Sequence, residues 1–387
     1  MDIVLNIEST TGFTGGIGQY TRNLLTGLRQ RDDIGKIHCF ARLQWIDTER
    51  RQDTESAEKP TQGKATARVK EILRSVPFAL TVNAAIKNHR FQRLARKLAG
   101  SVYHEPNFIL MPFDGPSVTT FHDLSFIHHP QYHPRERIHY MEKNLATTLQ
   151  RADHIITDSV YVSHELIDLL GVDAEKVTAI PLGVSSRFKP RHPTDMLSVL
   201  TRYNLQPGMY LLSVATLEPR KNIDHLLDAY LTLEKKLRTR FPLVIVGAEG
   251  WRSSKLKERI RDLQQKGEVI RPGFIPAEDL PVFFSGTAGF VYVPYYEGFG
   301  LPPLEAMASG TPILTSNVFS IPEVVGDAGL LADPDDIDAM AQGMKRMLLD
   351  EDWIARARAN GLQRAALFDW SRTVDLTVDV YKKVLGQ

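Results

Sequence analysis

The sequence predicts an α/β fold of two domains with parallel sheets, and three observations carry this prediction. Its 387 residues exceed what one hydrophobic core usually holds, so two domains are expected. Short apolar runs alternate with helix-length amphipathic stretches, which is typical of βαβ units and parallel sheets. The alternation breaks where Pro181, Gly183, Pro190 and Pro193 fall close together, as in an interdomain linker.

Apolar periodicity places the individual elements. In the first half we expect strands near 2–7, 37–41, 101–104, 116–121, 153–157 and 177–180, and helices near 17–30, 68–75, 84–99, 135–150 and 160–170. In the second half we expect strands near 209–215, 243–247, 269–271, 289–293, 312–315 and 329–331, and helices near 222–237, 253–266, 277–285, 302–309, 335–349 and 352–367. The stretch 371–385 is predicted to be a further amphipathic helix.

Composition bounds the possible partners and compartment. The net charge of +1 gives no general reason to expect nucleic acid as a partner. The single cysteine, Cys39, lies in an apolar run and is predicted to be a core residue. One cysteine makes no intrachain disulfide, so a reducing cytosol is expected. We expect no membrane-spanning helix, because no apolar run is long enough, and no secretory leader, because the chain starts with a strand-like run.

Two insertions interrupt the alternation in the first half. Residues 47–66 are polar and aperiodic, so we expect a mobile loop. Residues 64–100 carry nine Lys or Arg against one acid, Glu71, with apolar residues interleaved. This composition is compatible with a surface that rests on anionic lipid and equally with a solvated helix face over a core.

The segment Tyr296–Glu305 is the most informative part of the chain. It follows an apolar run, passes through Gly298 and Gly300, and enters a helix with proline near its start. A strand, a glycine turn and a helix N-terminus together suit a phosphate, held by backbone amides and the helix dipole. The carboxylates of Glu297 and Glu305 suit hydroxyl groups instead, so the predicted ligand is a nucleotide-sugar. The alternatives are a solvated loop acid for Glu297 and a dipole-complementing one for Glu305.

Two adjacent cations, Arg220 and Lys221, follow the predicted strand that ends near Thr216. In open α/β sheets ligands bind beyond the carboxyl ends of strands, and adjacent cations there suit a diphosphate. The alternative is a pair of solvated charges at a helix start, which the helix dipole disfavours.

The first half offers a glycine-rich turn and a histidine at a strand end. Glycines stand at 12, 15, 16 and 18, a spacing that does not match the dinucleotide fingerprint, and Ala41-Arg42 supplies no ribose-binding acid. We therefore expect a loop that closes over a substrate. His122-Asp123 ends a predicted strand and faces the same edge, with a structural His–Asp hydrogen bond as the alternative.

No metal site is predicted. His128, His129 and His133 lack a plausible ligand set. The acids Asp333, Asp335 and Asp336 are interpreted as a turn and a helix N-cap before Ile337.

Together these motifs resemble the retaining GT-B glycosyltransferases of family 4, a group that includes bacterial mannosyltransferases. Glu297 and Glu305 match its E-x7-E motif, and residues 216–222 its phosphate-binding stretch. Gly15–Gly18 resembles its acceptor loop, His122-Asp123 its sugar-contacting strand end, and Gly273-Phe274-Ile275 the stretch whose backbone meets the nucleobase. The insertion at 47–100 departs from the family on the acceptor side.

The resemblance implies two Rossmann-like domains that face each other across a cleft, with the C-terminal helix crossing back to pack on the first domain. It assigns residues 1–185 and 371–387 to acceptor binding and 190–370 to the nucleotide-sugar. It implies these catalytic residues: Glu297, His122, Arg220 and Lys221. It implies these donor-binding residues: Thr216, Phe274, Ile275, Gly298, Phe299, Gly300, Leu301 and Glu305. It implies this acceptor group: Gly15, Gly16, Ile17, Gly18 and Asp123. No metal or other cofactor is expected.

The expected activity is retaining transfer of a hexose to a hydroxyl of a glycan or lipid-linked acceptor in bacterial surface polysaccharide synthesis. The segments 216–222 and 295–308 look most like those of the mannosyltransferase branch of the family, which favours mannose from GDP-mannose or a related GDP-hexose. The expected place is the cytoplasm, with contact to the inner face of the membrane left open. Open alternatives are an epimerase or hydrolase of nucleotide-sugars, an NAD-dependent oxidoreductase and a non-catalytic sugar-binding or scaffold protein. A nucleophilic role for Glu297 is also open.

Overall fold

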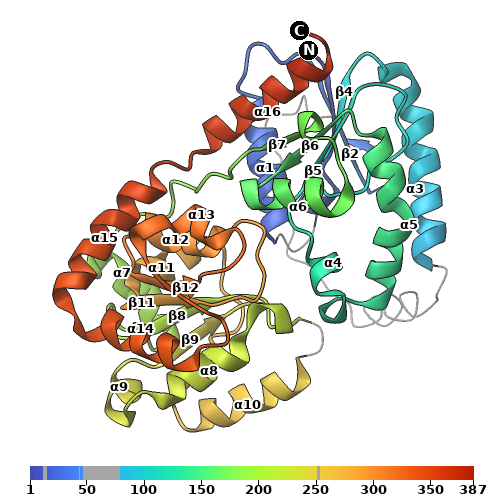
Figure 1. Ribbon diagram of the computed structural model, residues 1–387. Helices are drawn as coiled ribbons and strands as arrows, with labels where there is room; N and C mark the ends of the chain where they lie inside the picture. Colours follow the sequence, from blue (N-terminus) through green and yellow to red (C-terminus); the bar gives the residue numbers. More distant parts are fainter. Residues whose placement is uncertain (12–14, 43, 47–78, 251–252) are drawn as a thin grey trace.

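The computed structural model describes residues 1–11, 15–42, 44–46, 79–250 and 253–387. These residues form two α/β halves, each with its own sheet (Figure 1). Several predictions lie outside the described residues: the glycine at 12, the loop at 47–66, the helix at 68–75 and the first part of the basic insertion.

The first sheet has seven strands in the order β3-β2-β1-β4-β5-β6-β7. Their bounds are Ile3–Asn6 (β1), Ile37–Ala41 (β2), Gln44–Ile46 (β3), Val102–Glu105 (β4), Ser117–Phe121 (β5), His154–Thr157 (β6) and Val177–Ala179 (β7). All neighbours pair in parallel except β3, which returns antiparallel to β2. The predicted strands are confirmed, and β3 was missed because a three-residue strand has too little period to detect.

The second sheet has six parallel strands in the order β10-β9-β8-β11-β12-β13. Their bounds are Leu211–Val214 (β8), Leu243–Val246 (β9), Val269–Ile270 (β10), Gly289–Tyr292 (β11), Ile313–Ser316 (β12) and Leu330–Ala332 (β13). The central strands are apolar on both sides because helices cover both faces of the sheet.

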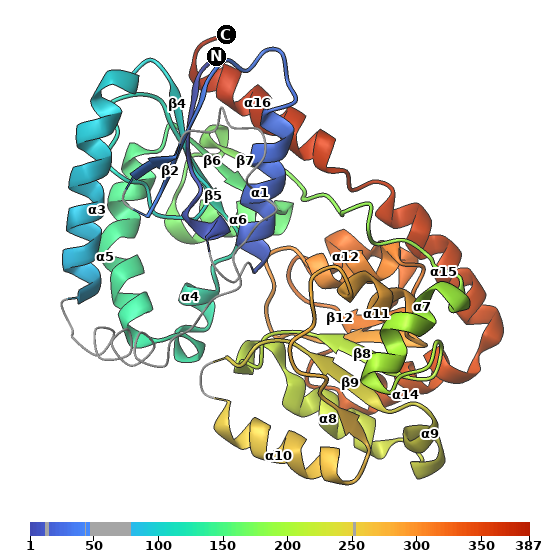
Figure 2. The same ribbon diagram turned by 180° about the vertical axis from the view of Figure 1, so that it is seen from behind.

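Helices flank both sheets, as parallel connections require. Those of the first half are Gly16–Leu28 (α1), Ala79–Ala95 (α3), Ser125–His128 (α4), Arg135–Arg151 (α5) and Val160–Leu170 (α6). Figures 1 and 2 show α3 and α5 on one side of the first sheet and α1 on the other.

The helices of the second half are Pro193–Leu200 (α7), Ile223–Thr232 (α8), Lys235–Arg240 (α9), Ser254–Gln265 (α10), Leu280–Gly286 (α11), Leu301–Ala308 (α12), Ile321–Val325 (α13), Ile337–Leu349 (α14) and Glu351–Ala365 (α15). The helix predicted at 222–237 is wrong as one element, because the backbone at Leu233 is extended and separates α8 from α9. The short helices α4 and α13 were not predicted, and neither was α7.

The C-terminal helix α16 (Trp370–Val384) crosses back to the first half, so the two chain ends lie together (Figures 1 and 2). The outgoing linker runs beside this return: Val184 N donates to Phe368 O at 3.2 Å. A side chain at Gly183 would place its Cβ 2.2 Å from Trp370 N, so only glycine fits there. The predicted crossing helix is confirmed. The exact domain boundaries stay a prediction.

Helix α16 packs on α1 and on the first sheet. Val378 and Tyr381 are fully buried, and the Tyr381 hydroxyl lies 2.6 Å from His104 Nδ1. The two helices lie close together at Gly27, where an added Cβ would lie 2.4 Å from Val374 Cγ2.

Gly27→Ala tests this contact. An alanine inside a helix normally stabilises by about 0.5–1 kcal/mol, but here the clash with Val374 should reverse the sign and cost roughly 1–3 kcal/mol. Urea denaturation should show lower stability for Gly27→Ala, and little or no loss when the same change is made in a Val374→Ala background. Gly361→Ala in α15 is the matched control, since its Cβ would meet Met307 at an ordinary 3.6 Å. A stabilising Gly27→Ala would contradict the packing.

Candidate active site

Loops after three parallel strands meet at the boundary between the two halves. Residues 293–300 follow β11 and lead into α12, and residues 215–221 follow β8. His122 and Asp123 follow β5 of the first sheet. Each loop therefore lies at the carboxyl end of its strand, where open α/β sheets bind ligands.

Lys221 and Glu297 form a close ion pair at this boundary. Lys221 Nζ lies 2.6 Å from Glu297 Oε2 and donates to the Tyr292 hydroxyl at 2.8 Å. Tyr292 in turn donates to Glu297 Oε2 at 2.9 Å. The Lys221 side chain is only 11% exposed, so the alternative of a solvated cation does not apply.

Arg220 lies among three carboxylates. Its Nη2 donates to Glu218 Oε1 at 3.0 Å, and its Nη1 lies 3.5 Å from Glu297 and 3.8 Å from Asp123. Burial opposes the charge, but these carboxylates outweigh it and raise the pKa of Arg220. The buried Nε of Arg220 has no hydrogen-bond partner among the described residues, which leaves one donor for a further acceptor.

Glu297 is ionised at neutral pH. Burial raises its pKa, but the charges of Lys221 and Arg220 and the hydrogen bonds from Lys221 and Tyr292 outweigh burial and leave the pKa lowered. An ionised carboxylate accepts hydrogen bonds from hydroxyl groups and stabilises nearby positive charge.

His122 pairs with Asp158 and not with Asp123. Its Nδ1 lies 2.7 Å from Asp158 Oδ2, and its Nε2 lies 2.7 Å from Pro106 O. Burial disfavours the charged ring, but Asp158 outweighs it and raises the pKa of His122. Both ring nitrogens therefore face protein acceptors in this structure.

Asp123 accepts hydrogen bonds from Ser125 N at 3.0 Å and Ser125 Oγ at 2.7 Å. Burial raises its pKa, but Arg220 and these bonds together lower the pKa of Asp123 to about 2. Asp123 thus joins the charged cluster from the first half, across the domain boundary.

The two halves approach each other closely at Gly298. A Cβ there would lie 1.8 Å from His122 O, and Ser159 Oγ donates to Gly298 O at 2.8 Å. Because glycine has no side chain, the backbone at Gly298 can lie directly against the backbone of His122 in the first half. Gly300 has φ of +116° and starts α12, a backbone conformation that glycine adopts readily.

Glu305 lies apart from this charged cluster, on α12. It is 6% exposed, and burial raises the pKa of its carboxyl to about 8, although Arg187 and a hydrogen bond to Gln19 act in the opposite direction. A protonated Glu305 can donate as well as accept a hydrogen bond. Gln19 belongs to α1, so Glu305 also touches the first half.

The remaining predicted residues lie around the same boundary or on one side of it. Gly15 is the N-cap of α1, and a Cβ at Gly16 would meet Leu301 Cδ1 at 3.7 Å, so the predicted acceptor turn faces the start of α12. Within that turn Ile17 is half-buried and Gly18 is buried. In the second half the structure buries Phe299, half-buries Thr216 and Ile275, and leaves Phe274 77% exposed.

Sequence reasoning missed Asp158, Tyr292 and Tyr296. Asp158 directly follows β6, so the rule that selected His122 could also have selected it. Tyr292 lies inside a buried strand and Tyr296 in a loop, and no local pattern marks either hydroxyl as a partner of Glu297 or of the first half.

Among the described residues, no group of three or more His, Cys, Asp or Glu is placed to hold a metal ion. The acidic turn behaves as interpreted: Asp333 Oδ1 accepts from Asp335 N, and Asp336 Oδ1 accepts from Ala339 N at the start of α14. In the part of the chain that the structure covers, no helix has the length and apolar character to span a bilayer.

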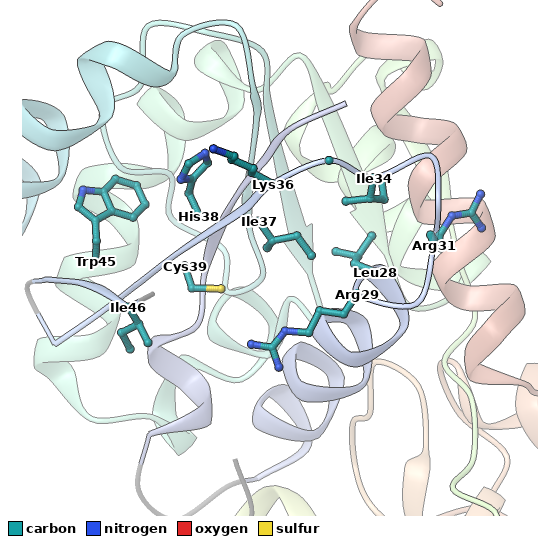
Figure 3. A pocket seen from close by; sticks show the side chains of 11 residues that line it. Leu28, Arg29, Arg31, Ile34, Lys36, Ile37, His38, Cys39, Trp45 and Ile46 are labelled. Atoms are coloured by element: carbon teal, nitrogen blue, oxygen red, sulfur yellow. The ribbon is translucent and has the colours of Figure 1, made fainter. Parts of the chain in front are cut away.

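A separate pocket of about 480 Å³ lies at the edge of the first sheet (Figure 3). Arg29, Lys36, His38, Trp45 and Ile46 are among its lining residues. Lys36 directly precedes β2, so the pocket reaches the amino end of that strand, away from the loops described above. Cys39 contributes to its wall and is buried, as the sequence predicts.

Comparisons with known proteins agree with this architecture. The model of "Glycosyltransferase Family 4" matches residues 14–188, and that of "Glycosyl transferases group 1" matches residues 205–364. The chain is 38% identical over 382 residues to O-antigen chain mannosyltransferase B of Escherichia coli, covering 99% of this chain and 100% of that protein. It is 26% identical to O-antigen chain mannosyltransferase RfbU of Salmonella typhimurium, covering 92% and 93%.

Solved structures share the fold at low identity. Anabaena HepE in complex with UDP and glucose superposes with a TM-score of 0.67 at 18% identity, covering 98% of both chains. WaaG, a glycosyltransferase involved in lipopolysaccharide biosynthesis, superposes with a TM-score of 0.66 at 14% identity, covering 98% of this chain and 99% of WaaG.

The fold and these matches define a glycosyltransferase of the GT-B architecture. The chain belongs to glycosyltransferase family 4, and its resemblance to the mannosyltransferases of that family is confirmed.

Glu305→Gln tests the buried carboxyl through stability. The folded pKa of Glu305 is raised to about 8 from 4.5, so folding favours the protonated form and the wild-type protein loses stability as pH rises between these values. Glutamine does not titrate. The melting temperature of Glu305→Gln relative to wild type should therefore rise from pH 5 to pH 9. Glu278→Gln, at an exposed position, is the matched control for the substitution itself. A flat difference for Glu305→Gln would refute the raised pKa.

Proposed function

We propose that this glycosyltransferase moves a mannosyl residue from GDP-mannose to a hydroxyl of a growing surface polysaccharide, with retention of anomeric configuration. The observation that carries the reaction type is the Arg220–Lys221–Glu297 cluster at the meeting point of both sheets. The sugar and the pathway are supported by the full-length similarity to an O-antigen chain mannosyltransferase. The GDP donor rests on the resemblance of the two sequence motifs to the mannosyltransferase branch of the family.

Cleavage of the anomeric bond places negative charge on the departing diphosphate. Arg220, whose Nε has no hydrogen-bond partner among the described residues, and Lys221 would stabilise that charge together with the backbone amides of 298–301. Because these groups are already held in place by protein contacts, little reorganisation is needed when the bond breaks. We propose that they make a metal ion unnecessary.

The same cleavage places positive charge on the sugar. The ionised Glu297 would bind a sugar hydroxyl and favour the oxocarbenium-like state. The departing phosphate would take the acceptor proton on the same face, which accounts for retention without a separate base. Glu305 would bind the ribose hydroxyls. For His122 to bind the sugar, its Nε2 would exchange Pro106 O for a sugar hydroxyl.

We place the first half on the acceptor side, with a glycan or lipid-linked acceptor. We further propose that the basic stretch 64–100 contacts anionic lipid on the cytoplasmic side of the membrane. Flotation with anionic liposomes tests that contact, and absence of binding at low salt would end it.

The decisive assay offers a panel of GDP-, UDP- and ADP-sugars with and without acceptor, followed by NMR of the product's anomeric proton. We expect GDP-mannose to be used most efficiently and the product to be an α-mannoside. Release of free sugar at the same rate with and without acceptor would indicate a hydrolase. Isomerised donor would indicate an epimerase, and transfer only from UDP-sugars would refute the donor assignment.

Arg220→Ala should lower kcat/KM about 10- to 150-fold, because one charge-assisted hydrogen bond contributes roughly 1.5–3 kcal/mol. Arg202→Ala is the matched control, since Arg202 pairs with Asp279 and is 55% exposed. Steady-state kinetics with saturating acceptor measure the difference. Near-normal turnover by Arg220→Ala would remove the leaving-group role.

Glu297→Ala should abolish most transfer while the protein remains folded. The carboxylate lies between two cations, so its loss leaves Lys221 and Arg220 with fewer partners. We expect the free energy of unfolding to fall by about 1–3 kcal/mol. Activity and the melting temperature are measured on the same preparation. Loss of activity accompanied by unfolding at the assay temperature would favour a structural role over a catalytic one.

A further inference from the structure

Tyr296, the residue before Glu297, connects the two halves of the protein through its hydroxyl. Its side chain is fully buried. The hydroxyl donates to Glu165 Oε2 at 2.6 Å and accepts from Leu124 N at 2.8 Å. Glu165 belongs to α6 and Leu124 precedes α4, so both partners lie in the first half while Tyr296 follows β11 of the second.

The ring of Tyr296 is packed between aromatic rings from both halves. Phe319 packs on it with ring centroids 4.5 Å apart, and His128 of the first half stacks on it at 5.5 Å. His128 Nε2 also lies 2.6 Å from Glu165 Oε1, so one carboxylate contacts both an element of its own half and Tyr296. The ring cannot shift without disturbing both halves.

A second contact lies at the rim of the same boundary. Glu323 of α13 accepts from Val160 N at 2.9 Å and from Tyr161 N at 3.2 Å, at the first turn of α6. These amides have no partner inside their own helix, and the positive end of the helix dipole favours a carboxylate there. The backbone around Glu323 is held in turn, because Arg364 of α15 donates to the carbonyls of Glu323 and Val324.

We propose that Tyr296 and Glu323 form an interdomain latch with α6, and that Tyr296 is thereby a positioning residue for Glu297. The effect of the latch on catalysis rests on the proposed function, whereas the connection that the latch makes between the two halves does not. With Tyr296 held by the first half, the adjacent Glu297 is fixed relative to His122 and Asp123. If the latch opens, Glu297 and the two cations withdraw together with the second half, away from the first-half residues.

The latch predicts a specific kinetic pattern. A nucleotide that binds to the second half does not need the first half, whereas transfer to an acceptor held by the first half does. Loss of the latch should therefore lower kcat more than it raises the donor KM. The Glu323 contact lies at the rim and should weaken with salt, whereas the buried Tyr296–Glu165 bond should not.

The experiment compares Tyr296→Phe and Glu323→Gln with two matched controls. Tyr295→Phe removes the neighbouring hydroxyl, which contacts His225 and Asp335 of its own half. Asp327→Asn removes an exposed acid just after α13. Hydrogen exchange is followed on the full chain, with and without GDP or UDP, in peptides covering 122–128 and 158–166.

In both test variants exchange in these two peptides should accelerate about 10-fold, because the local opening that exposes their amides becomes easier. The loss of one hydrogen bond should lower kcat about 10-fold with donor KM within about 2-fold of wild type. Both controls should match the wild-type protein.

Wild-type exchange and wild-type kcat in Tyr296→Phe and Glu323→Gln would overturn the latch. If Tyr296→Phe exchanges faster everywhere, including the peptide over α16, its effect is global. Glu323→Gln, a rim substitution with little risk to folding, then decides. If the wild-type protein transfers no sugar from any donor, the proposed function fails, and the exchange comparison still decides the latch.

Discussion

The pairing of two partly buried cations, Arg220 and Lys221, with Glu297 is the interaction on which the rest of the site depends. Removing charges from water is costly, and it is tolerated only where opposite charges and hydrogen bonds compensate. Glu297, Glu218 and Asp123 supply that compensation for Arg220, and Glu297 and Tyr292 do so for Lys221. The cations are thus held near one place and largely shielded from water before any substrate arrives, which is the condition for strong electrostatic stabilisation of a leaving group.

The loop after β11 serves both halves of the protein at once. Glu297 faces the cations of its own half, while its neighbours Tyr296 and Gly298 contact the first half through a buried hydroxyl and a backbone without a side chain. Asp123 contributes to the same charged cluster from the opposite side. Domain arrangement and local electrostatics are therefore coupled, because the same few residues determine both.

Local sequence patterns predicted the elements and the loops of the site, whereas contacts between distant segments were not predictable from them. The strands, most helices and the loops that carry Arg220, Lys221, Glu297 and His122 follow from periodicity and from the position of strand ends. Asp158 was within reach of the same rule. The partners of Tyr296 were not, because Glu165 lies 131 positions away and nothing in either segment indicates the other. The break between α8 and α9 was missed for a similar reason, since a buried leucine leaves the helical conformation where no proline or glycine marks the end.

The sequence by itself determined the alternating α/β order and the glycine turn before α12, because these depend on spacing within short segments, and its motifs resemble those of one family. Tertiary structure decided that His122 pairs with Asp158, that Gly298 makes room for protein, and that Glu305 is buried deeply enough to raise its pKa to about 8. Such properties depend on which distant groups meet and how much water they exclude, and no local pattern encodes that.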